Sequence, residues 1–194
     1  MGKTCFYKKS LLTYSLIIIN EYGDWMLVIS DSSTLILLAR ANILDQALAY
    51  FKGITIPKKV EKEVVEEGVR HGFADALLVR ERIKEGKIKV AKTSVGVTAR
   101  LQREYGLYGG EADALALYLH LKANLLGIDD GKAIKVCKIL QIRFFTALSL
   151  AIQLIQEKVI TKTEGPACLQ ELGKHGRYTK EELQMAFEQI GGGI

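Results

Sequence analysis

The sequence predicts an α/β fold of three layers, α/β/α, with a mostly parallel sheet of roughly five strands. Short apolar runs alternate with helical stretches from residue 26 onward, which is the pattern of crossovers between parallel strands. Several of these runs are apolar throughout, as expected for strands covered on both faces. The 194 residues are 48% hydrophobic and 25% charged, a composition that suits one globular domain and not a disordered chain.

The first half of the chain alternates strands with helices. The expected strands are 26–30, 54–56 and 88–92, and the expected helices are 35–40, 43–51, 57–68 and 73–85. Asn42 is a plausible cap for the second helix. Pro57 suits a first helical position, and Gly68 suits the residue that ends the same helix.

The second half continues the alternation. The expected helices are 98–105, 111–122, 131–140, 147–157 and 180–190, and the expected strands are 125–128 and 143–146. Residues 106–110 form a glycine-rich turn, and residues 161–179, rich in Gly, Lys and Thr, are expected to be a loop. No linker interrupts the chain, so residues 26–190 are predicted to form a single domain.

Residues 1–25 are expected to be an N-terminal extension or the result of a mis-assigned start. Lys8 and Lys9 precede an apolar run over residues 11–19. That run is too short to span a bilayer, and no small-residue cleavage site follows it. The three cysteines contain no CxxC pair, which favours reduced thiols in a cytoplasmic protein without a membrane partner.

Carboxylates occur at four places in the sequence, each at or shortly after a predicted strand or in the helix next to one. They are Asp31, Glu63, the pair Glu111 and Asp113, and the pair Asp129 and Asp130. In a parallel sheet, ligands bind beyond the carboxyl ends of the strands where strand order reverses, and the first and fourth strands are the expected neighbours there. Carboxylates that meet at one edge repel each other until a proton or a cation relieves them. The arrangement therefore predicts a site for Mg²⁺ or Mn²⁺.

Each carboxylate also has a purely structural interpretation. Aspartates between a strand and a helix often cap that helix, and acids are common in the first helical turn. Glu63 is separated from neighbouring glutamates only by helical phase, since it lies beside Val60 and Val64 on the side expected to face the sheet. The sequence leaves open whether Asp129 or Asp130 binds the metal, and whether one or two ions bind.

The same segments resemble the PIN-domain nucleases, and most closely the prokaryotic VapC-like branch. The resemblance runs through VISDSSTLILLARANILDQAL, ITIPKKVEKEVVEEG, GGEADALALYLHLKANLLGIDDGKA and the strand that ends at Thr146. It implies a metal-dependent ribonuclease, including the toxin of a toxin–antitoxin pair. The implied catalytic residues are Asp31, Glu63, Glu111, Asp113 and Asp130, and the implied metal ligands are Asp31, Glu111, Asp113, Asp129 and Asp130. Ser32, Ser33 and Thr146 are candidates for orienting those ligands.

A mildly basic chain, with a net charge of +5, suits a polyanionic partner. The candidate RNA contacts are Lys132, Lys135, Lys138 and Arg143. Single-stranded RNA is favoured, because the scissile phosphate must enter a cleft lined by carboxylates. A solvated basic helix explains the lysines equally well.

Two other functions compete with the nuclease. A phosphate-accepting receiver domain is disfavoured, because the paired acids follow the fourth strand and RFFTALS contains no lysine. A catalytically silent PIN-fold module that binds RNA or protein is the stronger alternative. A homodimer and an antitoxin are the expected protein partners, with residues 11–19 and the helix at 147–156 as candidate contact faces.

Overall fold

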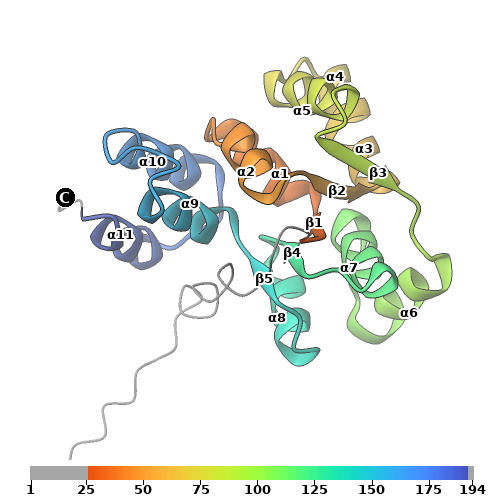
Figure 1. Ribbon diagram of the computed structural model, residues 1–194. Helices are drawn as coiled ribbons and strands as arrows, with labels where there is room; N and C mark the ends of the chain where they lie inside the picture. Colours follow the sequence, from red (N-terminus) through yellow and green to blue (C-terminus); the bar gives the residue numbers. More distant parts are fainter. Residues whose placement is uncertain (1–25, 192–194) are drawn as a thin grey trace, which may run out of the picture.

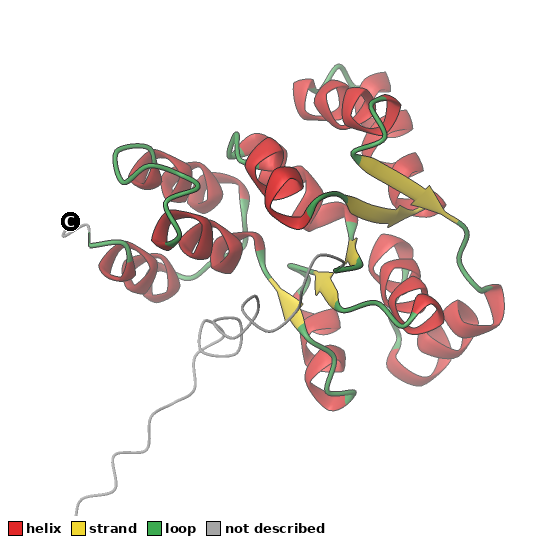
Figure 2. Ribbon diagram, viewed as in Figure 1, coloured by secondary structure: helices red, strands yellow, loops and turns green. Residues whose placement is uncertain are grey.

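The computed structural model describes residues 26–191, so the expectations for residues 1–25 lie outside the described part of the chain. Its centre is a five-stranded sheet in the order β3-β2-β1-β4-β5, with every neighbouring pair parallel. Helices flank this sheet (Figures 1 and 2), which confirms the predicted fold class. The strands are β1 Val28–Ser30, β2 Ile54–Pro57, β3 Ile88–Ala91, β4 Leu125–Gly127 and β5 Phe144–Phe145.

The helices occupy most of the remaining chain. They are α1 Ser32–Arg40, α2 Leu44–Phe51, α3 Lys58–Glu61, the π-helical η2 Lys62–Glu67, α4 Gly68–Arg70, α5 Ala74–Lys84, α6 Val95–Tyr105, α7 Gly109–Leu121, α8 Gly131–Ile139, α9 Ala147–Gln156, α10 Gly165–His175 and α11 Lys180–Gln189. Within residues 26–191, none of them is long and apolar enough to cross a membrane.

Two apolar cores lie on opposite faces of the sheet, because successive strand residues point to opposite sides. On one face Val28, Leu125 and Phe145 pack with helices α1, α2, α9 and α10. On the other face Ile29 and Leu126 pack with α7 and α8. This alternation makes the strands apolar on both sides and produces the three layers predicted from the sequence.

Three predicted helix boundaries are wrong. Asn42 adopts a positive φ of 57° and makes no cap; Ile43 precedes α2 without a side-chain cap. Pro57 is the last residue of β2. The helix after it continues through Gly68 to Arg70. Gly68 therefore does not end the helix; it allows close packing, since a Cβ there would lie 2.6 Å from Cβ of Ala76 on α5.

The segment 161–179, predicted to be a loop, contains the helix α10. Pro166 lies in its first turn, where proline is tolerated, and Cys168, Leu169 and Leu172 are buried. Figure 1 shows α9, α10 and α11 together at one side of the sheet. Helix α9 is buried along most of its length, so the expectation that it presents a partner face is also wrong: α10 and α11 of the same chain pack on it.

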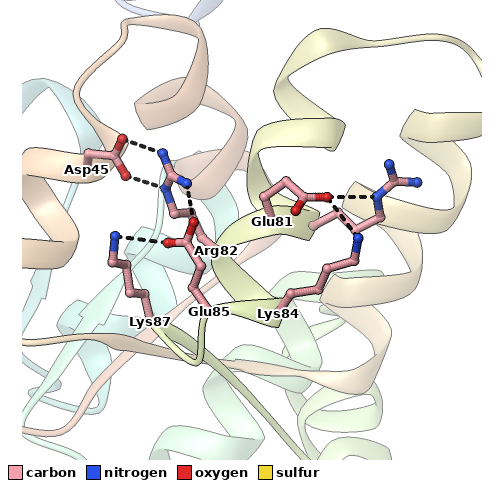
Figure 3. Close-up of polar contacts among 7 residues, drawn as sticks. Asp45, Glu81, Arg82, Lys84, Glu85 and Lys87 are labelled. Carbon is pink, nitrogen blue, oxygen red and sulfur yellow. Dashed lines mark hydrogen bonds and ion pairs between the residues drawn. The ribbon is translucent and has the colours of Figure 1, made fainter.

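An ion network on the surface connects α5 to α2. Arg82 donates from Nε and Nη2 to the two carboxylate oxygens of Asp45, at 2.5 and 2.7 Å, and it also contacts Glu85, which pairs with Lys87 (Figure 3). The Arg82 hydrogen bond lowers the pKa of Asp45. Because Asp45, Glu85 and Lys87 are exposed and Arg82 is only partly buried, we expect the network to orient α5 more than to stabilise the fold.

The Gly68 contact yields a stability prediction. Gly68→Ala should lower the free energy of unfolding by about 1–3 kcal/mol, because the added methyl forces η2, α4 and α5 apart. Gly96→Ala is the matched control, since a Cβ on Gly96 of α6 meets nothing within 4 Å. Urea denaturation of both variants measures the difference, and equal stability of the two would contradict the packing role of Gly68.

Candidate functional site

Four of the predicted carboxylates line one cavity at the point where strand order reverses. The chain forms β1, β2 and β3 in one direction across the sheet and then returns to place β4 on the other side of β1. The N–H group of Asp31 donates to the carbonyl oxygen of Gly127 at 3.0 Å, so the residues after β1 and β4 lie side by side. A cavity of about 720 Å³ opens here, and it is lined by Asp31, Glu111, Asp129 and Asp130 among other residues.

Asp31 is the most deeply buried of these acids, with 2% of its surface exposed. It caps α1: Oδ1 accepts from the N–H group of Thr34 at 2.8 Å, and Oδ2 accepts from the hydroxyl of Ser33 at 2.6 Å. The pKa of Asp31 is raised to about 7, chiefly by burial and also by the charge of Asp129, while the hydrogen bonds from Ser33 and Thr34 lower it and limit the rise. Ionising this carboxyl is therefore costly, and a bound cation would offset the cost.

Asp129 and Asp130 follow β4 but have different surroundings. Oδ2 of Asp129 accepts from the hydroxyl of Thr34 at 2.8 Å and from the N–H group of Ala147 at 2.9 Å, and Oδ1 accepts from the hydroxyl of Tyr178. Burial also raises the pKa of Asp129. Asp130 caps α8 through Oδ1 alone, which accepts from the N–H groups of residues 132 and 133, each at 2.9 Å.

The two acids on α7, Glu111 and Asp113, have different surroundings. Glu111 lines the cavity, and its Oε1 accepts from the N–H group of Tyr108 at 3.1 Å. Asp113 accepts from the hydroxyl of Thr98 on α6 at 2.8 Å and does not line the cavity. Helical residues two apart point to different sides, and that spacing explains why the structure brings only Glu111 to the cavity.

Glu63 lies beside the cavity and not in its lining. It accepts from the hydroxyl of Ser32, a cavity residue, at 2.5 Å, and Lys59 lies 3.5 Å from its other oxygen. A Cβ on Gly110 would meet both Glu63 and Ser32 at 2.5 Å. The first turn of α7 can approach Glu63 this closely only because position 110 has no side chain.

Some of the other predicted site residues line the cavity and others lie outside it. Ser32, Ser33 and Thr146 line the cavity, as does Lys132, whose Nζ donates to the carbonyl oxygen of Gly106 at 2.5 Å. Lys135, Lys138 and Arg143 are exposed and lie outside the lining. Arg40, His175 and Arg177 contribute to the wall of the cavity and were not predicted. The cationic wall therefore comes partly from α1 and from the segment after α10.

Sequence reasoning missed two residues that contact the acids directly, Thr34 and Tyr178. Thr34 carried a usable signal, because the third residue of a helix capped by Asp31 is the expected donor to that cap. Tyr178 carried none, since it is 49 positions from Asp129 and follows a helix that was predicted to be a loop.

Carboxylate oxygens are the ligands that Mg²⁺ and Mn²⁺ prefer. Asp31, Glu111 and Asp130 suit such an ion by donor chemistry, because they line one cavity and, among residues 26–191, no cationic side chain pairs with the buried Asp31. However, across residues 26–191 no three acidic, histidine or cysteine side chains lie close enough to form a ready metal site. Binding a metal would thus require side chains such as Glu111 to move toward Asp31.

Comparison with known proteins identifies a family and includes a distant structural likeness. The family model described as a PIN domain, DUF3368, matches residues 27–190. The crystal structure of PAE2754 from Pyrobaculum aerophilum is similar at 16% identity, with a TM-score of 0.47, over 66% of this chain and 96% of that one. A search of curated proteins found no significant match.

The raised pKa of Asp31 predicts how stability depends on pH without metal. The folded pKa, about 7, exceeds the ordinary value of 3.8, so the folded state binds more protons between these values. The contribution of Asp31 to stability is therefore present below about pH 4 and is lost as the pH rises through 7, a cost on the order of a few kcal/mol.

Asp31→Asn removes this titration. In EDTA, its melting temperature should exceed that of the wild type at pH 8, and the difference should shrink toward pH 4. Circular dichroism melts across this range provide the measurement, with Glu66→Gln, an exposed carboxylate on η2, as the control. A variant that follows the wild-type pH curve would show that burial of Asp31 imposes no such cost.

Proposed function

Because the chain belongs to the PIN-domain family, whose members are typically nucleases, we propose that it is a ribonuclease that requires Mg²⁺ or Mn²⁺ and hydrolyses phosphodiester bonds in RNA. One observation carries the proposal: Asp31, Glu111 and Asp130 come from three separate segments and line one cavity at the strand-order reversal. PIN-domain nucleases generally use divalent metals, and oxygen ligands at such a reversal suit that chemistry.

Asp31, Glu111 and Asp130 would hold the ion. Asp113 and Asp129 were also predicted as ligands from the sequence, but their oxygens are hydrogen-bonded within the protein: Asp113 accepts from Thr98, and Asp129 accepts from Thr34, Ala147 and Tyr178. Bound there, the ion supplies a water of lowered pKa and neutralises charge that develops on the phosphate. The protein contributes the orientation of the ligands. Ser33 and Thr34 hold both oxygens of Asp31, and the N–H groups at the start of α8 hold Oδ1 of Asp130, so these carboxylates have little freedom to turn away.

Glu63 is proposed to position the attacking water from beside the cavity. Its hydrogen bond to Ser32 fixes the carboxylate near the first turn of α7, and a Cβ on Gly109 would lie 3.4 Å from an oxygen of both Glu63 and Glu111. The two glutamates are therefore close neighbours, and a water molecule between them could contact both. Lys59, 3.5 Å from Glu63, moderates the charge of this pair.

Single-stranded RNA would reach the acids across the cationic wall of the cavity. Lys132 and Arg177 lie in that wall, where they can offset repulsion between phosphates and carboxylates. Lys135, Lys138 and Arg143 are exposed on and beyond α8 and would extend the contact along the strand. A flexible single strand suits this route because its phosphate can enter the cavity without a duplex being opened.

The motifs that resemble VapC-like toxins extend the proposal to a toxin–antitoxin pair. In that role an antitoxin protein would cover the cavity and suppress cleavage, and the nuclease would act as a homodimer. The cavity opens beside helices α1 and α8 and the segment after α10, and the antitoxin would bind there. A small antitoxin reading frame beside the gene would support this role.

A catalytically silent PIN-fold module that binds RNA or protein is the second candidate. One observation favours it: no three potential ligands gather into a ready metal site in the part of the chain that the structure describes. Calorimetric titration with Mn²⁺ separates the two candidates, because a silent module would bind no divalent ion.

The ribonuclease proposal predicts cleavage of single-stranded RNA in Mn²⁺ and none in EDTA. Asp31→Asn should reduce the rate by roughly a hundredfold or more, because the variant loses the charge that holds the ion. Gel analysis of a labelled RNA measures this, and circular dichroism checks that the variant is folded. Glu66→Gln is the control: it makes the same change from carboxylate to amide at an exposed position outside the cavity. Cleavage by Asp31→Asn at the wild-type rate would reject the assignment.

A further inference from the structure

Asp129 is the acid in the cavity whose oxygens are most fully engaged by the protein itself. Thr34 and the N–H group of Ala147 donate to Oδ2, and Tyr178 donates to Oδ1. Three donors from three segments, two of them hydroxyls, satisfy this partly buried carboxylate well. Little acceptor capacity remains for a metal ion or a water molecule.

Asp130 offers the contrast. Both of its donors, the N–H groups of residues 132 and 133, reach Oδ1, and within residues 26–191 no hydrogen bond reaches Oδ2. Its side chain is partly exposed to the cavity. Both aspartates line the cavity, but they differ in their hydrogen bonds: both oxygens of Asp129 accept from the protein, whereas only Oδ1 of Asp130 does.

Tyr178 comes from the segment between α10 and α11, yet it is joined to the same network twice. Its hydroxyl donates to Asp129, and its oxygen accepts from the N–H group of Leu148 in the first turn of α9 at 3.2 Å. Burial raises the pKa of Tyr178 above its ordinary value, and the neighbouring charge of Asp129 adds to this. The hydroxyl consequently stays protonated and remains a donor.

Thr34 links this network to Asp31. Its N–H group donates to Oδ1 of Asp31 at 2.8 Å, while its hydroxyl donates to Oδ2 of Asp129 at 2.8 Å. A continuous chain of hydrogen bonds thus runs from Tyr178 through Asp129 and Thr34 to Asp31. Displacing Tyr178 would leave one oxygen of the partly buried Asp129 carboxylate without a donor from the protein, and Asp129 would then turn and release Thr34.

From this network we infer that Tyr178 is a positioning residue: it keeps Asp129 in a structural role and couples the docking of α10 and α11 to the geometry of Asp31. As far as metal binding and cleavage are concerned, the inference rests on the proposed function. The hydrogen-bond coupling itself does not, and it can be measured in the metal-free protein.

The test begins with Tyr178→Phe, which keeps the ring and removes the hydroxyl. Amide exchange followed by NMR in metal-free, full-length protein should become roughly tenfold faster at Thr34 and Ala147. Neither of these amides bonds to Tyr178 directly, whereas a change at Leu148 is a direct effect and does not count. Tyr105→Phe, which removes a hydroxyl from α6, is the matched control and should leave both amides unchanged.

Mn²⁺ titration then separates a positioning role from general support of the fold. Well below the melting temperature, Tyr178→Phe should weaken Mn²⁺ binding by about tenfold. Asp129→Asn keeps an oxygen for Thr34 and Ala147 and should bind Mn²⁺ nearly as the wild type does. Asp130→Asn should lose at least about tenfold in affinity, because it removes the outward carboxylate.

Unchanged exchange at Thr34 and Ala147 in Tyr178→Phe would overturn the inference. So would an Asp129→Asn variant that loses Mn²⁺ as severely as Asp130→Asn, since Asp129 would then be a ligand. If the wild-type protein binds no Mn²⁺, the proposed function fails. The coupling through Tyr178 is still tested: faster amide exchange supports it, and unchanged exchange overturns it.

Discussion

The parallel pairing of β1 with β4 is the constraint on which the rest of the structure depends. Its register places Ser30 opposite Gly127, so Asp31, one residue after β1, and Asp129, two residues after β4, leave the sheet at the same edge. Gly127 also allows β5 to lie close on the other side of β4, because a Cβ there would lie 2.7 Å from the ring of Phe145. Neighbouring strands on both sides of β4 thus fix the position of the acids before any side-chain contact forms.

That convergence has an energetic cost, which the protein meets with hydroxyl groups. Ser33, Thr34 and Tyr178 all donate to Asp31 or Asp129, and the caps of α1 and α8 add backbone donors. Hydrogen bonds lower the cost of a buried anion but do not remove it, and the pKa of Asp31 remains raised to about 7. A buried carboxylate with a strongly raised pKa, facing a cavity, is a feature typical of functional sites.

The sequence was informative wherever a local rule determined the structure. The apolar runs located all five strands, and Asp31 could be singled out because a charge directly after a buried strand needs a partner. Gly68 misled, because glycine ends helices but also permits close helix packing, and only the position of Ala76 distinguishes the two. Helix α10 was missed since Gly165 and Pro166 at its start are also typical of loops. The division between Asp129 and Asp130 depends on Thr34, Ala147 and Tyr178, and no local pattern places those three together.

The C-terminal helices are part of the site because they are part of the core. Leu169 and Leu172 of α10 and Ala186 of α11 are buried in the same cluster as Val28 of β1 and Leu35 of α1. The apolar contacts that hold α10 and α11 in place therefore also fix the segment that carries Arg177 and Tyr178 into the cavity wall. Loosening these helices would alter the surroundings of Asp129 as well as the stability of the fold. The geometry of the acids is thus determined by the whole domain, from its first strand to its last helices, and not by the strand ends alone.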